Sequence, residues 1–209
     1  MKMQTLCRWR AACCAGLAGA LCLSCSRGPA SIPPVDVDIA QLAQQLMETH
    51  DKDKNGRLSR EELVSLAPVV EWSQAQRKQD ISPADLVQYL SRVFDRRIGL
   101  VSATCVVRRK GQVLAGAEVR LVPIAPLSDV LPTGQGVTDA YGGVMFSAPR
   151  EKLPAATQRV EGLMPPGLYL VEVTHPKIKI PEKYNKRTEL GLELSSDSAY
   201  RGLAIDLKF

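Results

Sequence analysis

The spacing of hydrophobic and polar positions changes along the chain and divides it into three parts. Residues 11–23 are an almost unbroken apolar run. Between residues 37 and 96, apolar residues recur every three or four positions, which predicts amphipathic helices. From residue 98 onward, short runs alternate apolar with polar residues between Gly and Pro, which predicts β-strands.

Two segments of the helical part show a clear apolar face. The first follows Asp38, a suitable N-cap, and its face consists of Ile39, Leu42, Ala43, Leu46 and Met47. The second begins near Ser82, Pro83 and Asp85, and its face consists of Leu86, Val87, Leu90 and Val93. Pro68 can begin a further short helix between them.

The β-rich part contains six runs with strand character: residues 101–110, 118–124, 143–148, 167–175, 190–194 and 203–209. We expect around seven strands in an antiparallel β-sandwich over residues 97–209. The expected fold class is therefore α + β, with the helices and the sandwich in separate domains. The segment Asp95–Gly99 is the expected boundary between these domains.

Residues 51–62, DKDKNGRLSREE, carry the most specific pattern in the chain. They match the twelve-residue EF-hand calcium loop, in which oxygens at alternate positions converge on one ion. The predicted ligands are the side chains of Asp51, Asp53 and Asn55, the main-chain carbonyl of Arg57, Ser59 directly or through a water, and both oxygens of Glu62. The alternative is a polar turn whose acids are simply solvated.

Two further features bear on this Ca²⁺ site. Lys52, Lys54, Arg57 and Arg60 offset the charge of the three carboxylates, so we expect affinity in the micromolar-to-millimolar range. The segment from Leu58 to Leu63 is echoed from Ile81 to Leu86, which would place Ile81 opposite Leu58 in a short bridge and Asp85 at a closing position. Residues 74–85 are either a degenerate second loop or an ordinary helix start, and neither adds a second metal.

The N-terminus has the order of a secretory signal peptide, because basic residues precede the apolar run. Five of the six cysteines lie in this region, and Leu21–Ser26 resembles a bacterial lipoprotein processing site with Cys25 as the acylated residue. An ordinary cleaved signal is the alternative. The expected organisation is a signal peptide at 1–24, a tether at 25–36, a helical EF-hand domain at 37–96 and the sandwich at 97–209.

The β-rich part also carries a family resemblance. Residues 106–122, Gly136–Asp139, Gly143–Phe146, Pro166–Val173 and 180–194 resemble the carboxypeptidase regulatory-like, transthyretin-related sandwich. Residues 180–194 are also similar to a version of this sandwich that is found in many predicted bacterial envelope proteins. The resemblance implies a non-catalytic module of the kind appended to peptidases, receptors or surface proteins.

Composition narrows the function classes further. The chain has 209 residues, with aromatic residues at 5%, which argues against a base-stacking surface for nucleic acid. The net charge of +5 falls to +2 without Lys2, Arg8 and Arg10 of the leader. A zinc peptidase centre is not expected, because His50 and His175 are the only histidines.

We therefore expect a non-enzymatic, exported, lipid-anchored calcium-binding protein of the cell envelope, located in the periplasm, at the outer membrane or secreted. Its expected partners are the calcium ion and an unidentified envelope protein or glycan, with membrane contact through the lipid anchor only and no nucleic acid. The alternative is an accessory subunit of an envelope or secreted hydrolase complex. A calcium sensor that exposes an apolar groove is a third option.

Overall fold

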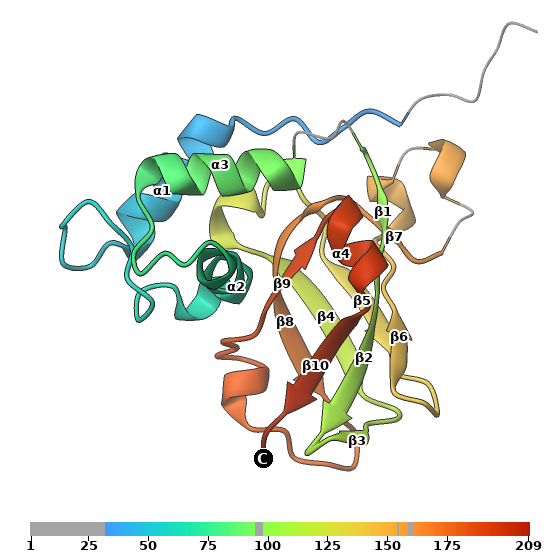
Figure 1. The fold of residues 1–209 in the computed structure, drawn as a ribbon. Coiled ribbons are helices and arrows are strands. Elements are labelled where there is room, and N and C mark those ends of the chain that lie inside the picture. The colour runs from blue at the N-terminus through green and yellow to red at the C-terminus, as the bar shows by residue number, and fades with distance from the viewer. Residues whose placement is uncertain (1–31, 95–97, 154, 159–160) are drawn as a thin grey trace, which may run out of the picture. The chain divides into compact units, whose positions relative to one another are not determined.

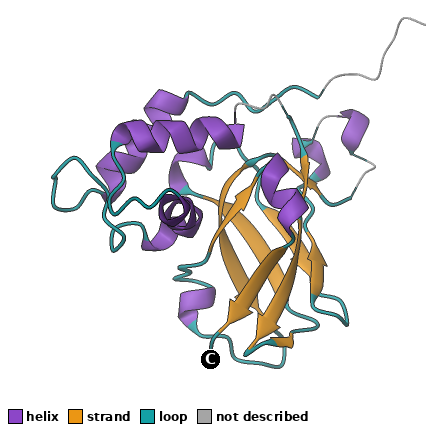
Figure 2. Cartoon of the chain, viewed as in Figure 1, coloured by secondary structure: helices purple, strands orange, loops and turns teal. Residues whose placement is uncertain are grey.

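The computed structural model describes residues 32–94, 98–153, 155–158 and 161–209, which combine helices with β-sheets in an α + β fold (Figures 1 and 2). The α-helices are α1 (Ile39–His50), α2 (Ala67–Ala75), α3 (Pro83–Phe94) and α4 (Ser196–Arg201). The short 3-10 helices are η1 (Val64–Leu66), η2 (Ala125–Leu127), η3 (Arg150–Lys152), η4 (Ala155–Thr157) and η5 (Glu182–Tyr184). The predicted signal peptide, Cys25, residues 25–31 of the tether and residues 95–97 lie outside the described residues.

The helices of the N-terminal part begin at the predicted caps. The Asp38 side chain accepts a hydrogen bond of 2.9 Å from the Gln41 amide at the start of α1. The Ser82 amide and hydroxyl both donate to the Asp85 carboxylate at the start of α3. α1 and α3 pack side by side, and their facing apolar residues are buried (Figure 1).

The chain does not enter a continuous helix directly after the acidic loop. Residues 60–63 form a turn, η1 follows, and α2 begins only at Ala67 with Pro68 in its first turn. Proline favours the first turn of a helix and cannot continue one that is already under way, because it lacks an amide hydrogen. The exit from the loop is therefore divided into two short helices.

The strands form two four-stranded sheets and one small pair. The strands are β1 (Val101–Ser102), β2 (Thr104–Arg109), β3 (Gln112–Val113), β4 (Glu118–Pro123), β5 (Gly134–Val137), β6 (Gly143–Met145), β7 (Leu163–Met164), β8 (Gly167–Thr174), β9 (Gly191–Leu194) and β10 (Leu203–Leu207). One sheet has the order β5-β4-β8-β9 and is antiparallel throughout. In the other, β2 pairs with β10 on one side and with β3 and β6 on the other. β1 pairs with β7.

The prediction of seven antiparallel strands is wrong in strand number and in one pairing direction. The described residues contain ten strands, of which β1, β3 and β7 have only two residues each. β10 runs parallel to β2, with Leu203 opposite Cys105. A two-residue strand is too short to show alternation, so the sequence pattern does not predict β1, β3 and β7. Alternation also does not reveal the direction of a neighbouring strand, so the parallel pairing of β10 with β2 is not predicted either.

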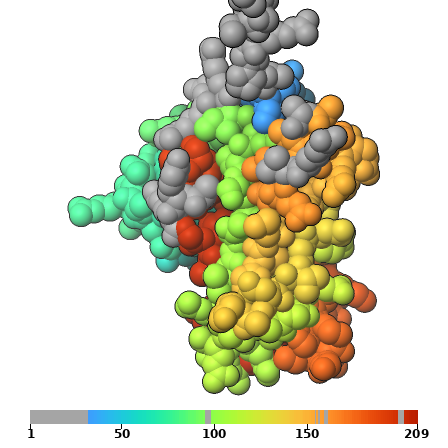
Figure 3. All heavy atoms as spheres, turned by 90° about the vertical axis from the view of Figure 1, so that its right-hand side faces the viewer, coloured from blue at the N-terminus to red at the C-terminus, as the bar shows by residue number. Residues whose placement is uncertain are grey.

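Both larger sheets bury alternate residues in a common apolar core. Val119 and Leu121 of β4 and Val171 and Val173 of β8 are fully buried, as is Val107 of β2 in the other sheet. The face turned toward the viewer in Figure 3 is covered by chain from β2, β3 and the β5–β6 segment. Residues 32–209 form one compact unit, which includes the helices.

Candidate metal site

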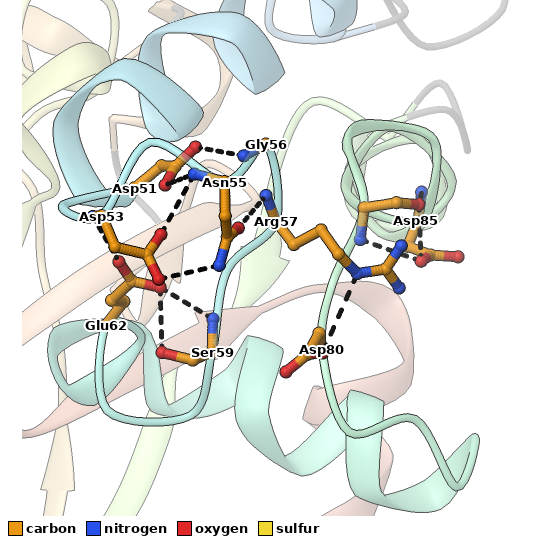
Figure 4. Close-up of polar contacts among 10 residues, drawn as sticks. Asp51, Asp53, Asn55, Gly56, Arg57, Ser59, Glu62, Asp80 and Asp85 are labelled. Carbon is orange, nitrogen blue, oxygen red and sulfur yellow. Dashed lines mark hydrogen bonds and ion pairs between the residues drawn. The ribbon is translucent and has the colours of Figure 1, made fainter.

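The acidic loop lies between α1 and η1 and brings three carboxylates together (Figure 4). Asp51, Asp53 and Glu62 each offer a carboxylate oxygen, and these oxygens lie within 4.8 Å of one another. Among the described residues, no other group of three His, Cys, Asp or Glu side chains meets this condition. Carboxylate oxygens at this spacing suit a hard cation such as Ca²⁺ or Mg²⁺.

The loop curls because its side chains accept hydrogen bonds from its own backbone. The two oxygens of Asp51 accept from the amides of Asn55 at 3.1 Å and Gly56 at 2.8 Å. The Asn55 side-chain oxygen accepts from the Arg57 amide at 2.8 Å. These contacts turn the side chains of Asp51 and Asn55 toward the inside of the curl (Figure 4).

Gly56 has the backbone conformation that the calcium-loop pattern requires at its sixth position. Its φ is +77°, in the left-handed region that residues with a Cβ atom adopt at a cost. An added Cβ at this position would meet no other atom within 4 Å. A glycine is therefore favoured at this position by its positive φ and not by a lack of space for a side chain.

Glu62 closes the loop by contacting both of its ends. Its Oε1 accepts from the Lys52 amide at 2.7 Å, and its Oε2 accepts from the Ser59 amide and hydroxyl, both at 2.9 Å. The hydrogen bonds from Ser59 and then that from Lys52 lower the pKa of the Glu62 carboxyl to about 2. The group is therefore ionised over the neutral range, as a calcium ligand must be.

The other predicted site residues occupy defined positions. Asn55 donates from its side chain to Asp53 at 2.8 Å, and Ser59 is part-buried beside Glu62. The Arg57 side chain lies 3.8 Å from Asp80, and both side chains are about half exposed. His50, next to Asp51, has a pKa lowered below its usual value because it is partly buried, so it adds no positive charge to the loop at neutral pH.

The predicted echo of the loop is also present. Leu58 and Ile81 form an isolated antiparallel bridge, with amide-to-carbonyl distances of 2.8 and 2.9 Å, and both side chains are fully buried. This confirms the expected pairing of the two segments. Asp85 also begins α3 through Ser82, as the alternative of an ordinary helix start expects, whereas a degenerate second loop at residues 74–85 stays a prediction.

The second segment has an internal cation that sequence reasoning did not place. The Lys78 ammonium pairs with the Asp85 carboxylate, which takes the position equivalent to Glu62. This contact, followed by the hydrogen bond from the Ser82 hydroxyl, lowers the pKa of Asp85 to about 2. Lys78 lies seven residues before Asp85 in the chain, and this spacing alone does not identify the pair.

Three further side chains with reactive or polar groups lie outside the acidic loop. Cys105 is buried, and burial raises the pKa of its thiol to about 12. Asp139 accepts hydrogen bonds from the amides of Tyr141 and Gly143, both at 2.8 Å, as expected of a turn. His175 contacts the Ala115 carbonyl oxygen at 3.0 Å.

A scan against protein-family models, a search of curated proteins and a search of solved structures found no match to this chain. Within the described residues, no helix is both long enough and apolar enough to span a bilayer.

Proposed function

We propose that this protein is an exported, lipid-anchored calcium-binding protein whose β-rich part is a non-catalytic interaction module of the carboxypeptidase regulatory-like type. The observation that carries the calcium assignment is the convergence of Asp51, Asp53 and Glu62 within 4.8 Å in a curled loop. The bridge between Leu58 and Ile81 supports an EF-hand-like arrangement of the helical segment, in which the second loop holds no metal.

The charge distribution favours a site of modest affinity. The three carboxylates lie among exposed Lys52, Lys54, Arg57 and Arg60, which reduce the local negative potential. Dissociation constants of about 10⁻⁶ to 10⁻³ M suit a site that is filled outside the cytoplasm, where calcium is abundant. We propose that bound calcium fixes the turn between α1 and η1.

Calorimetric titration of residues 26–209 with Ca²⁺ and Mg²⁺ tests the site. We expect saturable Ca²⁺ binding that Glu62→Gln weakens at least tenfold, since one ligand oxygen and one charge are lost. Glu61→Gln is the matched control, because Glu61 is exposed, adjacent and outside the predicted ligand set, and it should change affinity by less than about threefold. No saturable heat in the wild type, or equal effects of both variants, would contradict the assignment.

Metabolic labelling with a palmitate analogue tests the lipid anchor. The full chain, expressed in a bacterium with a lipoprotein pathway, should incorporate the label and fractionate with membranes. Cys25→Ser should abolish both, whereas Cys14→Ser, a change of the same kind outside Leu21–Ser26, should leave labelling in place. Labelling that persists in Cys25→Ser would show that the anchor is assigned to the wrong residue or does not exist.

A further inference from the structure

A groove of about 720 Å³ runs along one side of the sheets, next to α2. Residues 203–206 of β10 line one wall, and α2 and residues 189–193, which include the first part of β9, line the others. Trp72, in α2, contributes a part-buried aromatic ring to this lining. α2, β9 and β10, which contribute these lining residues, are labelled in Figure 1.

The two sheet edges that meet here differ in how they are covered. β9 is the last strand of its sheet, and α2 packs on it so closely that a Cβ at Gly191 would lie 2.9 Å from the Pro68 side chain. β10 is the last strand of the other sheet and pairs only with β2 among the described strands. The outer edge of β10 is therefore not paired with a described strand, although the amide and carbonyl of Lys208, just after β10, contact the Tyr184 hydroxyl.

The groove is acidic although the chain as a whole carries a net charge of +5. Glu71, Glu189 and Asp206 line it from three different elements or segments, and all three are exposed. No ion pair with any of them is found among the described residues. The Asp206 carboxylate accepts one hydrogen bond, from the Gly111 amide at 3.1 Å, and lies opposite Arg108 in the pairing of β10 with β2.

The cation among the described lining residues is already engaged. Arg92 lies 2.5 Å from the Glu193 carboxylate and 3.7 Å from Asp197. Glu193 in addition accepts hydrogen bonds from Tyr89 at 2.8 Å and Ser195 at 2.6 Å. Arg92 is thus paired within the groove lining and does not neutralise Glu71, Glu189 or Asp206.

We propose that this groove binds an extended, basic segment of a partner protein, which adds as a strand to β10. Backbone hydrogen bonds to the outer edge of β10 would supply affinity, and alternate Lys or Arg side chains would lie against Glu71, Glu189 and Asp206. A second copy of this chain is a poor occupant, because it would bring its own Glu71 and Glu189 to a surface that is already acidic. The proposal deepens the interaction-module half of the proposed function and does not depend on calcium.

Isothermal titration of residues 26–209, which contain the whole compact unit, with the peptide acetyl-Lys-Val-Lys-Val-Lys-Val-amide tests this proposal. We expect saturable binding that weakens as salt rises. The same peptide with N-methylated valines keeps its charge but loses backbone donors on one edge, and it should bind about tenfold more weakly. A peptide with Glu in place of Lys should not bind.

Charge reversal in the protein locates the binding surface. Glu71→Lys combined with Glu189→Lys should weaken binding at least tenfold, with an unchanged circular dichroism spectrum. Asp129→Lys combined with Glu151→Lys is the matched control, because both carboxylates are exposed and outside the groove lining, and it should alter binding by less than about threefold.

Several results would overturn the proposal. These are the absence of saturable binding, equal binding of the N-methylated peptide, and equal effects of the two double variants. Sedimentation that shows a dimer disrupted by the groove variant would assign the edge to a second copy instead. None of these outcomes bears on the Glu62→Gln titration, so failure of the groove and failure of the calcium site are distinguishable.

Discussion

At the scale of single residues, the two segments joined by the bridge between Leu58 and Ile81 hold their carboxylates differently. Glu62 accepts hydrogen bonds from backbone amides and a hydroxyl and lies near two other carboxylates. Asp85 is paired with the ammonium of Lys78, beside the Trp72 ring. A side-chain cation thus compensates the second segment internally, whereas the first collects negative charge that an added cation can compensate.

The Lys78–Asp85 pair predicts acid-sensitive stability. The folded-state pKa of Asp85 is about 2, below the usual 3.8, so the unfolded chain binds more protons as the pH falls between these values. The contribution of the pair is therefore complete above about pH 4 and is lost as the pH falls toward 2. Asp85→Asn should lower the free energy of unfolding by roughly 1–2 kcal/mol at pH 7, with the difference from wild type shrinking toward pH 2.

Urea unfolding of both proteins between pH 2.5 and 7 measures this difference. Asp129→Asn removes an exposed carboxylate and should change stability by no more than about 0.5 kcal/mol at any of these pH values. A constant difference between wild type and Asp85→Asn across the range would show that the pair does not carry the effect.

Local chemistry made several of these residues predictable. Asp38, Gly56 and Ser59 are positioned by hydrogen bonds or backbone angles within a few residues, so their types and spacing reveal their roles. The partner of Lys78 is seven residues away across an irregular turn, where no period fixes side-chain direction. Such a contact depends on the folded path of the chain and not on the spacing alone.

At the scale of elements, the bridge between Leu58 and Ile81 joins the two segments and places α1, α2 and α3 around one apolar centre. Each residue donates and accepts one backbone hydrogen bond. Because both side chains are fully buried, the bridge is stabilised by packing as well as by these bonds.

Truncation of the Ile81 side chain in this bridge should lower the free energy of unfolding. Ile81→Ala should reduce the free energy of unfolding by about 2–5 kcal/mol, because it removes buried methyl groups and leaves a cavity, whereas Ile81→Val should cost about 0.5–1.5 kcal/mol. Equilibrium urea unfolding monitored by tryptophan fluorescence measures both, since Trp72 lies in the same part of the chain. Equal and small effects would mean that the site collapses around the missing atoms.

The sequence predicts where the strands lie better than it predicts which strands pair with each other. β2, β4 and β8 have six to eight residues and bury alternate or nearly alternate side chains, which is the signal that predicted them. β10 has the same signal, but its parallel pairing with β2 joins segments about 100 residues apart in the chain. That choice depends on the path through α4, which links one sheet to the other.

At the scale of the whole molecule, the helical part and the sheets share contacts that neither shows alone in the sequence. Tyr89 of α3 is fully buried, packs on Trp72 of α2 with ring centroids 5.5 Å apart, and donates to Glu193 of β9. Burial, followed by the charge of Glu193, raises the pKa of the Tyr89 hydroxyl well above its usual value. The hydroxyl therefore stays a donor to Glu193 at any ordinary pH.

These contacts predict that residues 32–209 unfold cooperatively, and that calcium at the loop stabilises the sheets as well. Scanning calorimetry should show one transition, which calcium at about 100 times its Kd stabilises by about 2.7 kcal/mol, or roughly 5–10 °C. Glu62→Gln should show the same single transition with little calcium shift. If the helices were instead an independent domain, calcium would move only an early, minor transition and leave the main one in place.

A single calcium-sensitive transition would mean that the acidic loop and α2, which forms one wall of the groove, unfold together with the sheets. The contacts of α3 with Glu193 join the helices to the sheets, so ordering of the loop by the ion would also stabilise the sheets.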